Sequence, residues 1–368
     1  MKIGILTYHR AHNYGAMLQA YALRTTLRHN KHNDVQFIDY WPLSHQKQYA
    51  LFKPIIGTNI ASKCKNLILN LLTLIRRYRR IRKFEHFGQK YLELPKYIVY
   101  PQDQQVITEQ YDCIVVGSDQ IWRNHVTAHQ KIGFDPVYFC QTLAHPTHCI
   151  SYAASMGIID FSKDEEQLLK QYLDAFSTIL VRENNLKNLV EQLGHSATVV
   201  LDPTLLLTKE QWNELLSAER YCKQKYVLYY ELLPSPSARL FAKQKAKSMG
   251  CKLLIMDAVI RTMPRLGHIA FASPIEFLHA IRDAEYVIAT SFHGTAFSII
   301  FEKQFLTVGL KKNSDRVKTL LNHLAIEEHY QEIPKAISTI DYSTVRKQLA
   351  FHREQSLTLL HQAIDNLQ

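Results

Sequence analysis

The sequence predicts an α/β protein with two Rossmann-like domains that face a central cleft. Short runs rich in β-branched and aromatic residues alternate with helical segments, which is typical of parallel α/β layers. The 368 residues exceed the roughly 250 to 300 at which a single hydrophobic core stops growing. Several glycines follow strand-like runs, where open α/β sheets bind ligands. They are Gly15, Gly117, Gly157 and Gly294.

Ten segments have the length and composition of buried strands. In the first half of the chain they cover residues 2–8, 35–39, 112–117, 149–154, 178–182 and 198–202. In the second half they cover residues 226–230, 252–256, 285–290 and 305–309. Because helical runs separate them, we expect parallel strands that are joined by helices.

Capping signals between these strands mark where helices begin. Ser162 with Glu165, and Thr208 with Gln211, each form a capping box. The segment 273–276, Ser-Pro-Ile-Glu, combines a capping box with a proline at the first helical position. An apolar helix is also predicted over 295–301.

The charged stretch 209–225 contains no strand-like run and is the predicted domain boundary. We expect an N-terminal Rossmann-like domain over 1–210, with a basic insertion at about 55–105, and a C-terminal Rossmann-like domain over 211–368. Two such halves place the loops at their strand ends around a shared cleft. The predicted architecture is therefore GT-B-like, as in two-lobed glycosyltransferases.

The composition is that of an ordinary globular protein, with 46% hydrophobic and 21% charged residues. Six scattered cysteines without a CxxC spacing predict free thiols rather than a disulfide framework or a zinc site. The N-terminus runs from Met1 and Lys2 directly into a strand-like segment, without a secretory pattern. We therefore expect a cytoplasmic protein.

The net charge of +11 predicts an acidic partner. An apolar stretch that begins at Asn66 is too short to span a bilayer, which takes about 20 apolar residues. It runs into six basic residues, and two interpretations stay open. One is an interfacial helix in peripheral contact with an anionic membrane at its inner face, and the other is a core helix with a solvated basic end. Nucleic acid is disfavoured, because the cluster is confined to one segment without a recognition motif. The basic residues are Arg76, Arg77, Arg79, Arg80, Arg82 and Lys83.

The segment 289–302 sets His293 between a predicted strand and a predicted helix, with Gly294 at the turn. Free N–H groups and the positive dipole end at a helix start attract phosphate or carboxylate. A histidine can add a hydrogen bond or a proton. A hydrogen-bonded structural histidine is the more common reading of such a tetrapeptide alone, but the junction suits an anionic substrate.

Five segments meet at predicted strand ends, and they resemble the polysaccharide pyruvyl transferase family. They cover residues 9–23, 115–122, 150–157, 180–183 and 290–301, and Leu-Asp-Pro-Thr-Leu-Leu-Leu over 201–207 belongs to the same resemblance. The resemblance implies transfer of a pyruvyl group from phosphoenolpyruvate to a sugar, commonly as a ketal that bridges two hydroxyls. It implies as acceptor a cell-surface polysaccharide, an exopolysaccharide or a lipid-linked precursor of either, and no cofactor beyond the phosphoenolpyruvate donor.

The resemblance gives two residues the central roles. Arg182 would hold the carboxylate or phosphate of phosphoenolpyruvate with its planar fork, although its position after a strand alone favours a salt-bridged structural arginine. His293 would protonate the methylene carbon or stabilise the departing phosphate. Ser291 and the amides around Gly294 would complete the phosphate contacts.

The acceptor hydroxyl needs a base, and Asp119 and Glu183 are both candidates. Glu183 could instead pair with Arg182, and Asp119 could instead cap the helix that follows. Ser118 is a candidate substrate contact in the same loop. Trp122 would form a stacking wall for a sugar ring, with core packing as the alternative.

Asn13, Tyr14 and Gly15 follow the first predicted strand, so that their loop points into the predicted cleft. Asn13 and Gln19 are candidate acceptor contacts, with Tyr14 and Gly15 in the same binding loop. Two histidines nearby lack a third ligand, so no metal site is predicted.

Three positions depart from the usual family pattern, namely Leu180, Arg123 and Gln304. Arg123 leaves the acceptor open, because a charged side chain there could contact a phosphate or an acidic sugar. Two other functions also stay open. One is a nucleotide-sugar-dependent glycosyltransferase on the same scaffold, and the other is a non-catalytic saccharide-binding protein.

Overall fold

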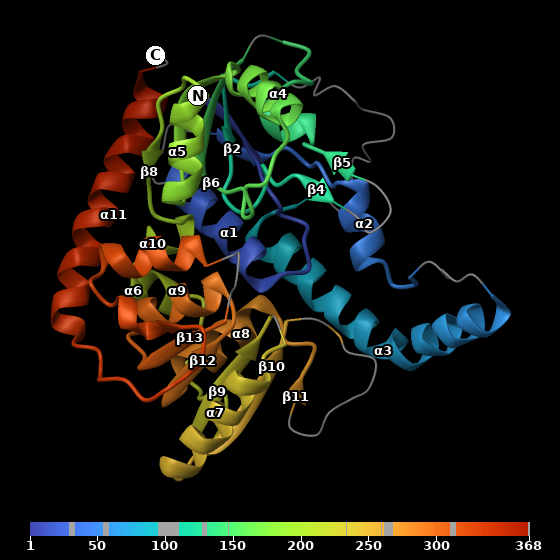
Figure 1. Cartoon of the computed structure of the whole chain (residues 1–368), viewed down its shortest axis with the longest axis vertical. Coiled ribbons are helices and arrows are strands. Elements are labelled where there is room, and N and C mark those ends of the chain that lie inside the picture. The colour runs from blue at the N-terminus through green and yellow to red at the C-terminus, as the bar shows by residue number, and fades with distance from the viewer. Residues whose placement is uncertain are drawn as a thin grey trace.

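A computed structural model describes residues 1–28, 34–53, 59–94, 110–126, 131–145, 147–232, 234–258, 260, 268–309 and 314–366. These residues form two six-stranded parallel sheets flanked by helices (Figure 1). The predicted α/β class, with two Rossmann-like halves in a GT-B-like arrangement, is confirmed.

The first sheet has the strand order β2-β1-β3-β6-β7-β8, and all neighbours are parallel. All six predicted strands of this half are confirmed, although β8 is only two residues long. A short antiparallel pair, β4 and β5, stands apart from the sheet. The bounds are β1 Lys2–Leu6, β2 Asp34–Phe37, β3 Cys113–Val116, β4 His125–Val126, β5 Lys131–Gly133, β6 His148–Ala154, β7 Phe176–Val181 and β8 Thr198–Val199.

The second sheet has the order β11-β10-β9-β12-β13-β14, again with parallel neighbours. The four predicted strands of this half are confirmed. The edge strands β11 and β14 were not predicted, because two residues are too few to show an alternating pattern. The bounds are β9 Tyr226–Glu231, β10 Lys252–Asp257, β11 His268–Ile269, β12 Tyr286–Ala289, β13 Phe305–Val308 and β14 Tyr330–Gln331.

The helices begin where capping signals predict them. In α4, α6 and α8 the side chains of Ser162, Thr208 and Ser273 accept the N–H three residues on, and the box is completed in return. The α-helices are α1 Tyr14–Arg28, α2 Leu43–Tyr49, α3 Ile60–Tyr91, α4 Lys163–Leu173, α5 Asn184–Gln192, α6 Lys209–Asn213, α7 Pro236–Ser248, α8 Pro274–Arg282, α9 Phe292–Ile300, α10 Asp315–His323 and α11 Tyr342–Asp365.

Each sheet has one point where its strand order reverses, and these two points face the same space. In the first sheet it lies between β1 and β3, which lead into α1 and into the loop after Gly117. In the second it lies between β9 and β12, and β12 leads into α9. Crevices at such switch points are where open α/β sheets bind ligands.

The two halves share one hydrophobic core. A continuous cluster of buried apolar side chains includes Ile5 and Val115 of the first sheet and Leu228 and Phe305 of the second. Between the sheets, the ring of Tyr14 in α1 stacks on Phe277 in α8 at a centroid distance of 4.9 Å.

Arg80 on α3 forms hydrogen bonds that link the two halves at this contact. Its guanidinium donates to the hydroxyl of Tyr14 (3.1 Å) and to the carbonyls of Ala258 (2.7 Å), Ala270 (3.2 Å) and His12 (3.0 Å). The sequence placed Arg80 in a solvated or lipid-facing basic cluster. The structure corrects this assignment, because the polar groups that Arg80 satisfies lie in both halves of the protein.

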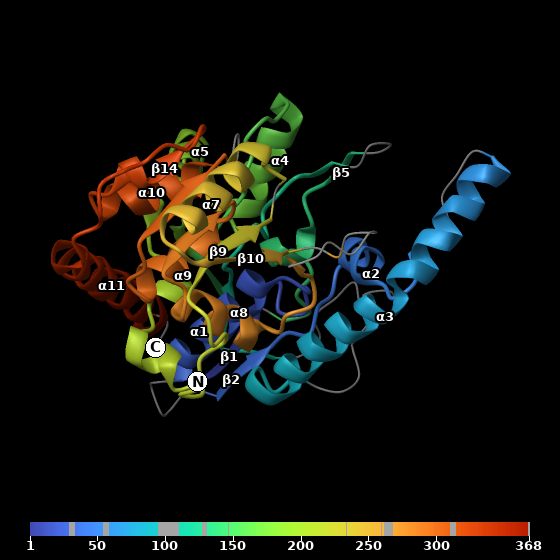
Figure 2. The same cartoon turned by 90° about the horizontal axis from the view of Figure 1, so that it is seen from below.

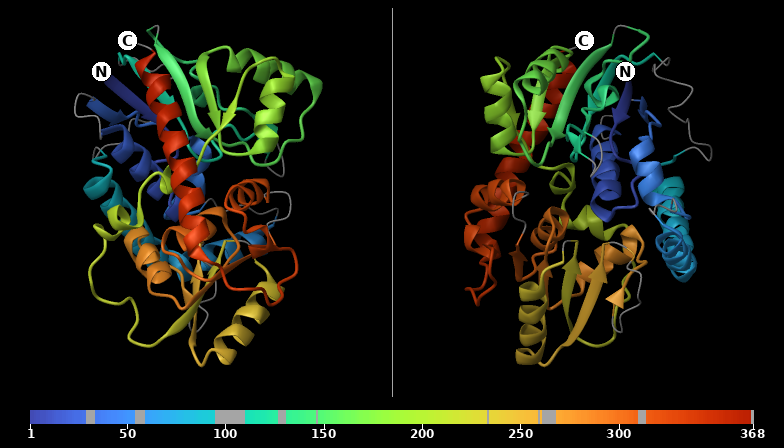
Figure 3. Two further views of the ribbon diagram at one scale, coloured as in Figure 1. Left: turned by 90° about the vertical axis from the view of Figure 1, so that its left-hand side faces the viewer. Right: turned by 45° about the vertical axis from the view of Figure 1, so that its right-hand side comes forward.

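The helix α11 follows the second sheet in sequence but reaches back to the first half (Figure 3). The hydroxyl of Ser356 accepts the N–H of Leu201 (3.0 Å), and Arg353 donates to the carbonyl of Leu205 (2.8 Å). The limits 1–210 and 211–368 stay a prediction. The sheets are compatible with a boundary between Val199 and Tyr226.

The long helix α3 projects from the body of the protein (Figures 1 and 2). It is one continuous helix of 32 residues that contains the whole predicted apolar and basic stretch. Among the described residues, no helix has the length and apolar character that crossing a bilayer requires.

Candidate active site

A cavity of about 200 Å³ lies where the two switch points meet. Loops after β1, β3 and β9, the first turn of α9 and one residue of α10 line it, and α2 closes one side. Four of its side chains are basic or imidazole groups, and one is a carboxylate. They are His45, Arg123, His293, Arg316 and Asp119.

His293 lies in the first turn of α9, because that helix begins three residues before its predicted start. Its side chain is 11% exposed and lines the cavity. The Nε2 atom faces Oδ2 of Asp202 at 3.7 Å and is buried without a hydrogen-bond partner among the described residues. A small movement of the ring would bring Nε2 within hydrogen-bond distance of Oδ2 of Asp202.

Gly15 packs directly against the ring of His293. A Cβ atom built on Gly15 would lie 1.9 Å from Nδ1 and 2.2 Å from Cγ of that ring. Real Cβ atoms essentially never come closer than 3.0 Å to such atoms. Only glycine at this position lets α1 and α9 approach each other, so the predicted site residues Gly15 and His293 meet.

Arg182, at the end of β7, is buried behind the cavity and does not line it. Its side chain is 1% exposed and donates to Oδ2 of Asp202 (2.6 Å) and to Oδ1 of Asp119 (3.4 Å). The structure shows the ion-paired residue that its position alone favours, rather than the predicted direct clamp. Gripping a phosphate would require the pair with Asp202 to break.

Asp202 is a residue that the sequence analysis did not select, although it lies in the matched segment 201–207. It is buried, its Oδ1 accepts from the N–H and hydroxyl of Thr204, and its Oδ2 faces both Arg182 and His293. Burial raises the pKa of this carboxyl, but His293 and then Arg182 outweigh burial and hold the pKa far below its usual range. Asp202 is therefore a fixed negative charge behind the site.

Asp119 lines the cavity directly after β3. Its φ of 76° lies in the left-handed region, which is uncommon for a residue with a side chain. Burial raises the pKa of its carboxyl, but Arg182, His293 and Arg316 together lower that pKa on balance. The side chain accepts the N–H of Gln120 (2.8 Å), but no helix lies between β3 and β4, so the predicted helix cap is not formed.

Glu183 does not reach the cavity. Its Oε2 lies 3.9 Å from Nε of Arg182, and its Oε1 accepts from the hydroxyl of Ser155 (2.8 Å) and the N–H of Met156 (3.0 Å). The structure shows the predicted alternative, a partner of Arg182. A buried carboxylate with these contacts has no path to an acceptor hydroxyl in this arrangement.

Arg316 lines the cavity together with Arg123, and the sequence analysis missed it. Burial and then the charge of Arg182 lower its pKa to about 10, against the pull of the carboxylates around it. Its Nε is buried and has no hydrogen-bond partner among the described residues. The ring of Phe292 lies against both guanidiniums, 4.8 Å from that of Arg182 and 6.0 Å from that of Arg316.

Ser291 and Asn13 line the cavity as predicted, but both side chains cap helices. The hydroxyl of Ser291 accepts the N–H of Gly294 (2.9 Å), and Asn13 accepts the N–H of Ala16 (3.3 Å). Gly294 lies within α9 rather than at a turn before it, which corrects the prediction. Its amide is already bonded and is not free for a phosphate.

Tyr14, Gln19, Ser118 and Trp122 do not line the cavity, and each is buried. Gln19 links the loop after β1 to the loop after β3. It donates to the hydroxyl of Thr7 (2.8 Å) and accepts the N–H of Ser118 (3.1 Å). Trp122 donates to the carbonyl of Tyr138 (3.0 Å) and is fully buried. Trp122 therefore packs in the core and does not form the predicted sugar-stacking wall.

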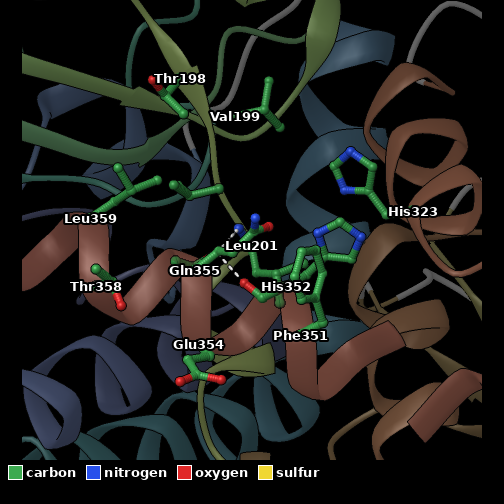
Figure 4. A pocket seen from close by; sticks show the side chains of 12 residues that line it. Thr198, Val199, Leu201, His323, Phe351, His352, Glu354, Gln355, Thr358 and Leu359 are labelled. Atoms are coloured by element: carbon green, nitrogen blue, oxygen red, sulfur yellow. Dashed lines mark hydrogen bonds between the residues drawn. The ribbon is translucent and has the colours of Figure 1, made fainter. Parts of the chain in front are cut away.

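A larger cavity of about 420 Å³ lies between β8, α10 and α11 (Figure 4). His323 and His352 stack there with ring centroids 4.6 Å apart. Its lining includes none of the predicted site residues. Within the described part of the chain, no group of three or more His, Cys, Asp or Glu side chains is arranged to hold a metal ion.

The fold and the cavity define the class of this protein: a two-lobed α/β scaffold of the GT-B-like kind, with a polar cavity between the lobes. The chain belongs to the polysaccharide pyruvyl transferase family, whose sequence model matches residues 13–312. The matched range contains every predicted site residue. It ends just before Arg316.

Solved structures similar to this chain include several sugar-nucleotide enzymes. A UDP-N-acetylglucosamine 2-epimerase described as putative, from Listeria monocytogenes, has 10% identity and a TM-score of 0.47, with 98% of this chain and 90% of that chain covered. The UDP-GlcNAc 2-epimerase from Neisseria meningitidis has 9% identity and a TM-score of 0.44, with coverage of 98% and 94%. No curated protein matches the chain in sequence.

Proposed function

We propose that this protein transfers a pyruvyl group from phosphoenolpyruvate to a sugar of a cell-surface or extracellular polysaccharide, or of its lipid-linked precursor. One observation carries the proposal. Arg316 lines a small cavity together with His293 and the ionised Asp119, and its buried Nε–H has no hydrogen-bond partner among the described residues. An anion in this cavity would relieve the repulsion between Arg316 and Arg182.

The reaction places clear demands on these groups. The methylene carbon of phosphoenolpyruvate takes a proton, the neighbouring carbon becomes electrophilic, and a sugar hydroxyl forms a C–O bond to it. A second hydroxyl then forms the other C–O bond while the bond to the phosphate oxygen breaks. Of the two hydroxyl protons, one balances the proton taken by the methylene carbon and the other leaves with inorganic phosphate.

The geometry supports a division of roles. His293 is the general acid, because its imidazole lines the cavity and Asp202 behind it can balance positive charge on the ring. Arg316 holds the phosphate or the carboxylate of the donor. Asp119 accepts the acceptor proton. Its lowered pKa makes it a weak base in the empty site, and a bound dianion would offset the nearby cations and strengthen it.

Arg182 acts through its neighbours in this proposal. It holds Asp202 and approaches Asp119, so that it fixes the two carboxylates on either side of the site. It is a positioning residue.

The proposal is tested by product identity. We expect the purified protein, with phosphoenolpyruvate and a panel of methyl hexosides or isolated polysaccharide, to release inorganic phosphate and to yield an acceptor that carries a pyruvate ketal. Nucleotide release from a sugar donor, with phosphoenolpyruvate left intact, would favour a glycosyltransferase. Phosphoenolpyruvate that binds without phosphate release on any acceptor would favour a binding protein.

Arg316→Gln is expected to weaken phosphoenolpyruvate binding by about 10- to 100-fold, because a charge-assisted hydrogen bond contributes about 1.5–3 kcal/mol. Isothermal titration with phosphoenolpyruvate measures the effect. Arg346→Gln is the matched control, since Arg346 is an exposed arginine in the same half. An unchanged Kd in Arg316→Gln would remove Arg316 from the donor site.

Gly15→Ala is expected to lower the rate of phosphate release by about 100-fold, because the new methyl group must displace the ring of His293 and small misplacements of catalytic groups are costly. Gly88→Ala is the control. Its Cβ would come closest to the flexible end of Leu94, at 3.1 Å, and would touch the end of Met17 at an ordinary contact distance of 3.6 Å. Equal rates in both variants would show that the contact between α1 and His293 does not position the ring.

A further inference from the structure

The projecting part of α3 presents an apolar face to solvent. On a helix, residues three, four and seven positions apart lie on one side. The exposed apolar residues of α3 follow this spacing, and Ile60 and Ile75 are 81% and 67% exposed. The others are Leu67, Ile68, Leu71, Leu72 and Tyr78.

The opposite side of the same helix faces the protein. Asn70, Thr73 and Arg80 are buried at a matching spacing. Asn70 exchanges hydrogen bonds with the backbone of Lys53, and Arg77 donates to Asn70 and to the carbonyl of Leu51. The polar groups of α3 thus attach the helix to the body while its apolar groups point outward, which is the reverse of a core helix.

The charge of α3 is of one sign over most of its length. Between Ile60 and Phe84 the sequence contains eight Lys and Arg residues and no Asp or Glu. Arg80 and Lys83 are engaged within the protein, the latter with Glu276 at 2.6 Å. The exposed cations that flank the apolar face are Lys63, Lys65, Arg79 and Arg82.

We propose that this face of α3 binds the surface of an anionic lipid bilayer. Apolar side chains enter the boundary below the headgroups, while flanking Lys and Arg side chains contact the phosphates, as in interfacial helices. A second copy of this chain is the weaker candidate. Pairing two such helices would bring two rows of cations together, and the net charge of +11 adds to that repulsion.

Docking through α3 would also set the position of the cavity. The C-terminal part of α3 is rigidly held, since Phe84 and Phe87 belong to the shared core and Arg80 bonds to both halves. A helix that is fixed at one end and membrane-bound along the other holds the site at a constant height over the bilayer. The binding itself does not depend on the reaction proposed above.

The test is co-sedimentation of the full chain with vesicles of phosphatidylcholine, with or without phosphatidylglycerol. We expect binding only to the anionic vesicles, weakened by added salt. The variant Lys65→Gln/Arg79→Gln/Arg82→Gln should bind about 100-fold more weakly, at about fivefold per cation. The variant Ile68→Gln/Leu71→Gln/Ile75→Gln should bind at least tenfold more weakly.

The matched control is Leu240→Gln/Ile333→Gln/Phe351→Gln, which removes three exposed apolar residues elsewhere on the surface. It should bind like the wild type, and all variants should keep the wild-type melting temperature. Equal binding to neutral vesicles, or an equal loss in the control, would overturn the proposal. So would a concentration-dependent dimer that the α3 apolar variant converts to monomer, because a second copy would then cover this face.

Discussion

His293→Gln is expected to lower the rate of pyruvyl transfer by about 100- to 10,000-fold, the range that a positioned general acid contributes. Glutamine keeps hydrogen-bonding groups of similar size but cannot deliver a proton at neutral pH. Phosphate release from phosphoenolpyruvate in the presence of acceptor measures the loss. Donor binding should change far less, since Arg316 is intact.

The matched control for His293→Gln is His323→Gln. His323 is a partly buried histidine of the same half, stacked on His352 outside the cavity between the lobes. We expect near-normal transfer in this variant. If His293→Gln and His323→Gln had the same rate, His293 would not be the acid. Normal turnover with a strongly raised KM in His293→Gln would assign the ring to binding rather than to proton transfer.

Arg182→Ala is expected to destabilise the protein by about 3–5 kcal/mol in addition to abolishing transfer, because it leaves Asp202 as an unpaired buried charge. The family role alone predicts a folded but inactive protein. The structure changes that expectation, since both partners are almost fully inaccessible to solvent. Equilibrium unfolding in urea measures the difference in free energy.

A second substitution separates the contribution of Arg182 to stability from its contribution to positioning the site. Adding Asp202→Asn to Arg182→Ala removes the unpaired charge and should restore part of the stability without restoring activity. Arg346→Ala, at an exposed pair with Glu302, should stay within about 1 kcal/mol of the wild type. A stability of Arg182→Ala equal to that of the wild type would show that the ion pair contributes nothing net.

The sequence predicts most of the fold because its signals are local. Ten strands show apolar runs of sufficient length, and three helix starts carry complete capping boxes. The strands β11 and β14 escape detection because each forms only through pairing at a sheet edge. The order of strands depends on contacts between segments far apart in the chain, so alternation predicts the class but not the register.

The site is only partly predictable, because its electrostatics depend on long-range packing. The junction at His293 can be found from a strand followed by a helix, and Gly15 from a glycine after the first strand. Arg316 carries no such local signal. Arg316 reaches the cavity only because α10 packs against α9. In the same way, Arg182 can be buried because Asp202, from another segment, supplies a carboxylate that pairs with it.

The basic stretch illustrates the same limit within one helix. Its composition allows either an interfacial or a core helix, and the structure contains elements of both. Arg80 and Lys83 serve the junction between the halves, whereas Leu71 and Ile75 face solvent. Periodicity alone does not tell which side of a helix meets the body, because here the polar side does so.

The hydrophobic cluster that spans the two sheets restricts how the protein can move. Two-lobed proteins with a thin hinge can undergo domain closure around a ligand. Separating these lobes, however, would expose buried rings such as Tyr14 and Phe277 to water. We therefore expect little closure of the lobes when a ligand binds, with adjustment left to the side chains that line the cavity. Radius of gyration should accordingly stay constant when the donor is added, even as turnover proceeds.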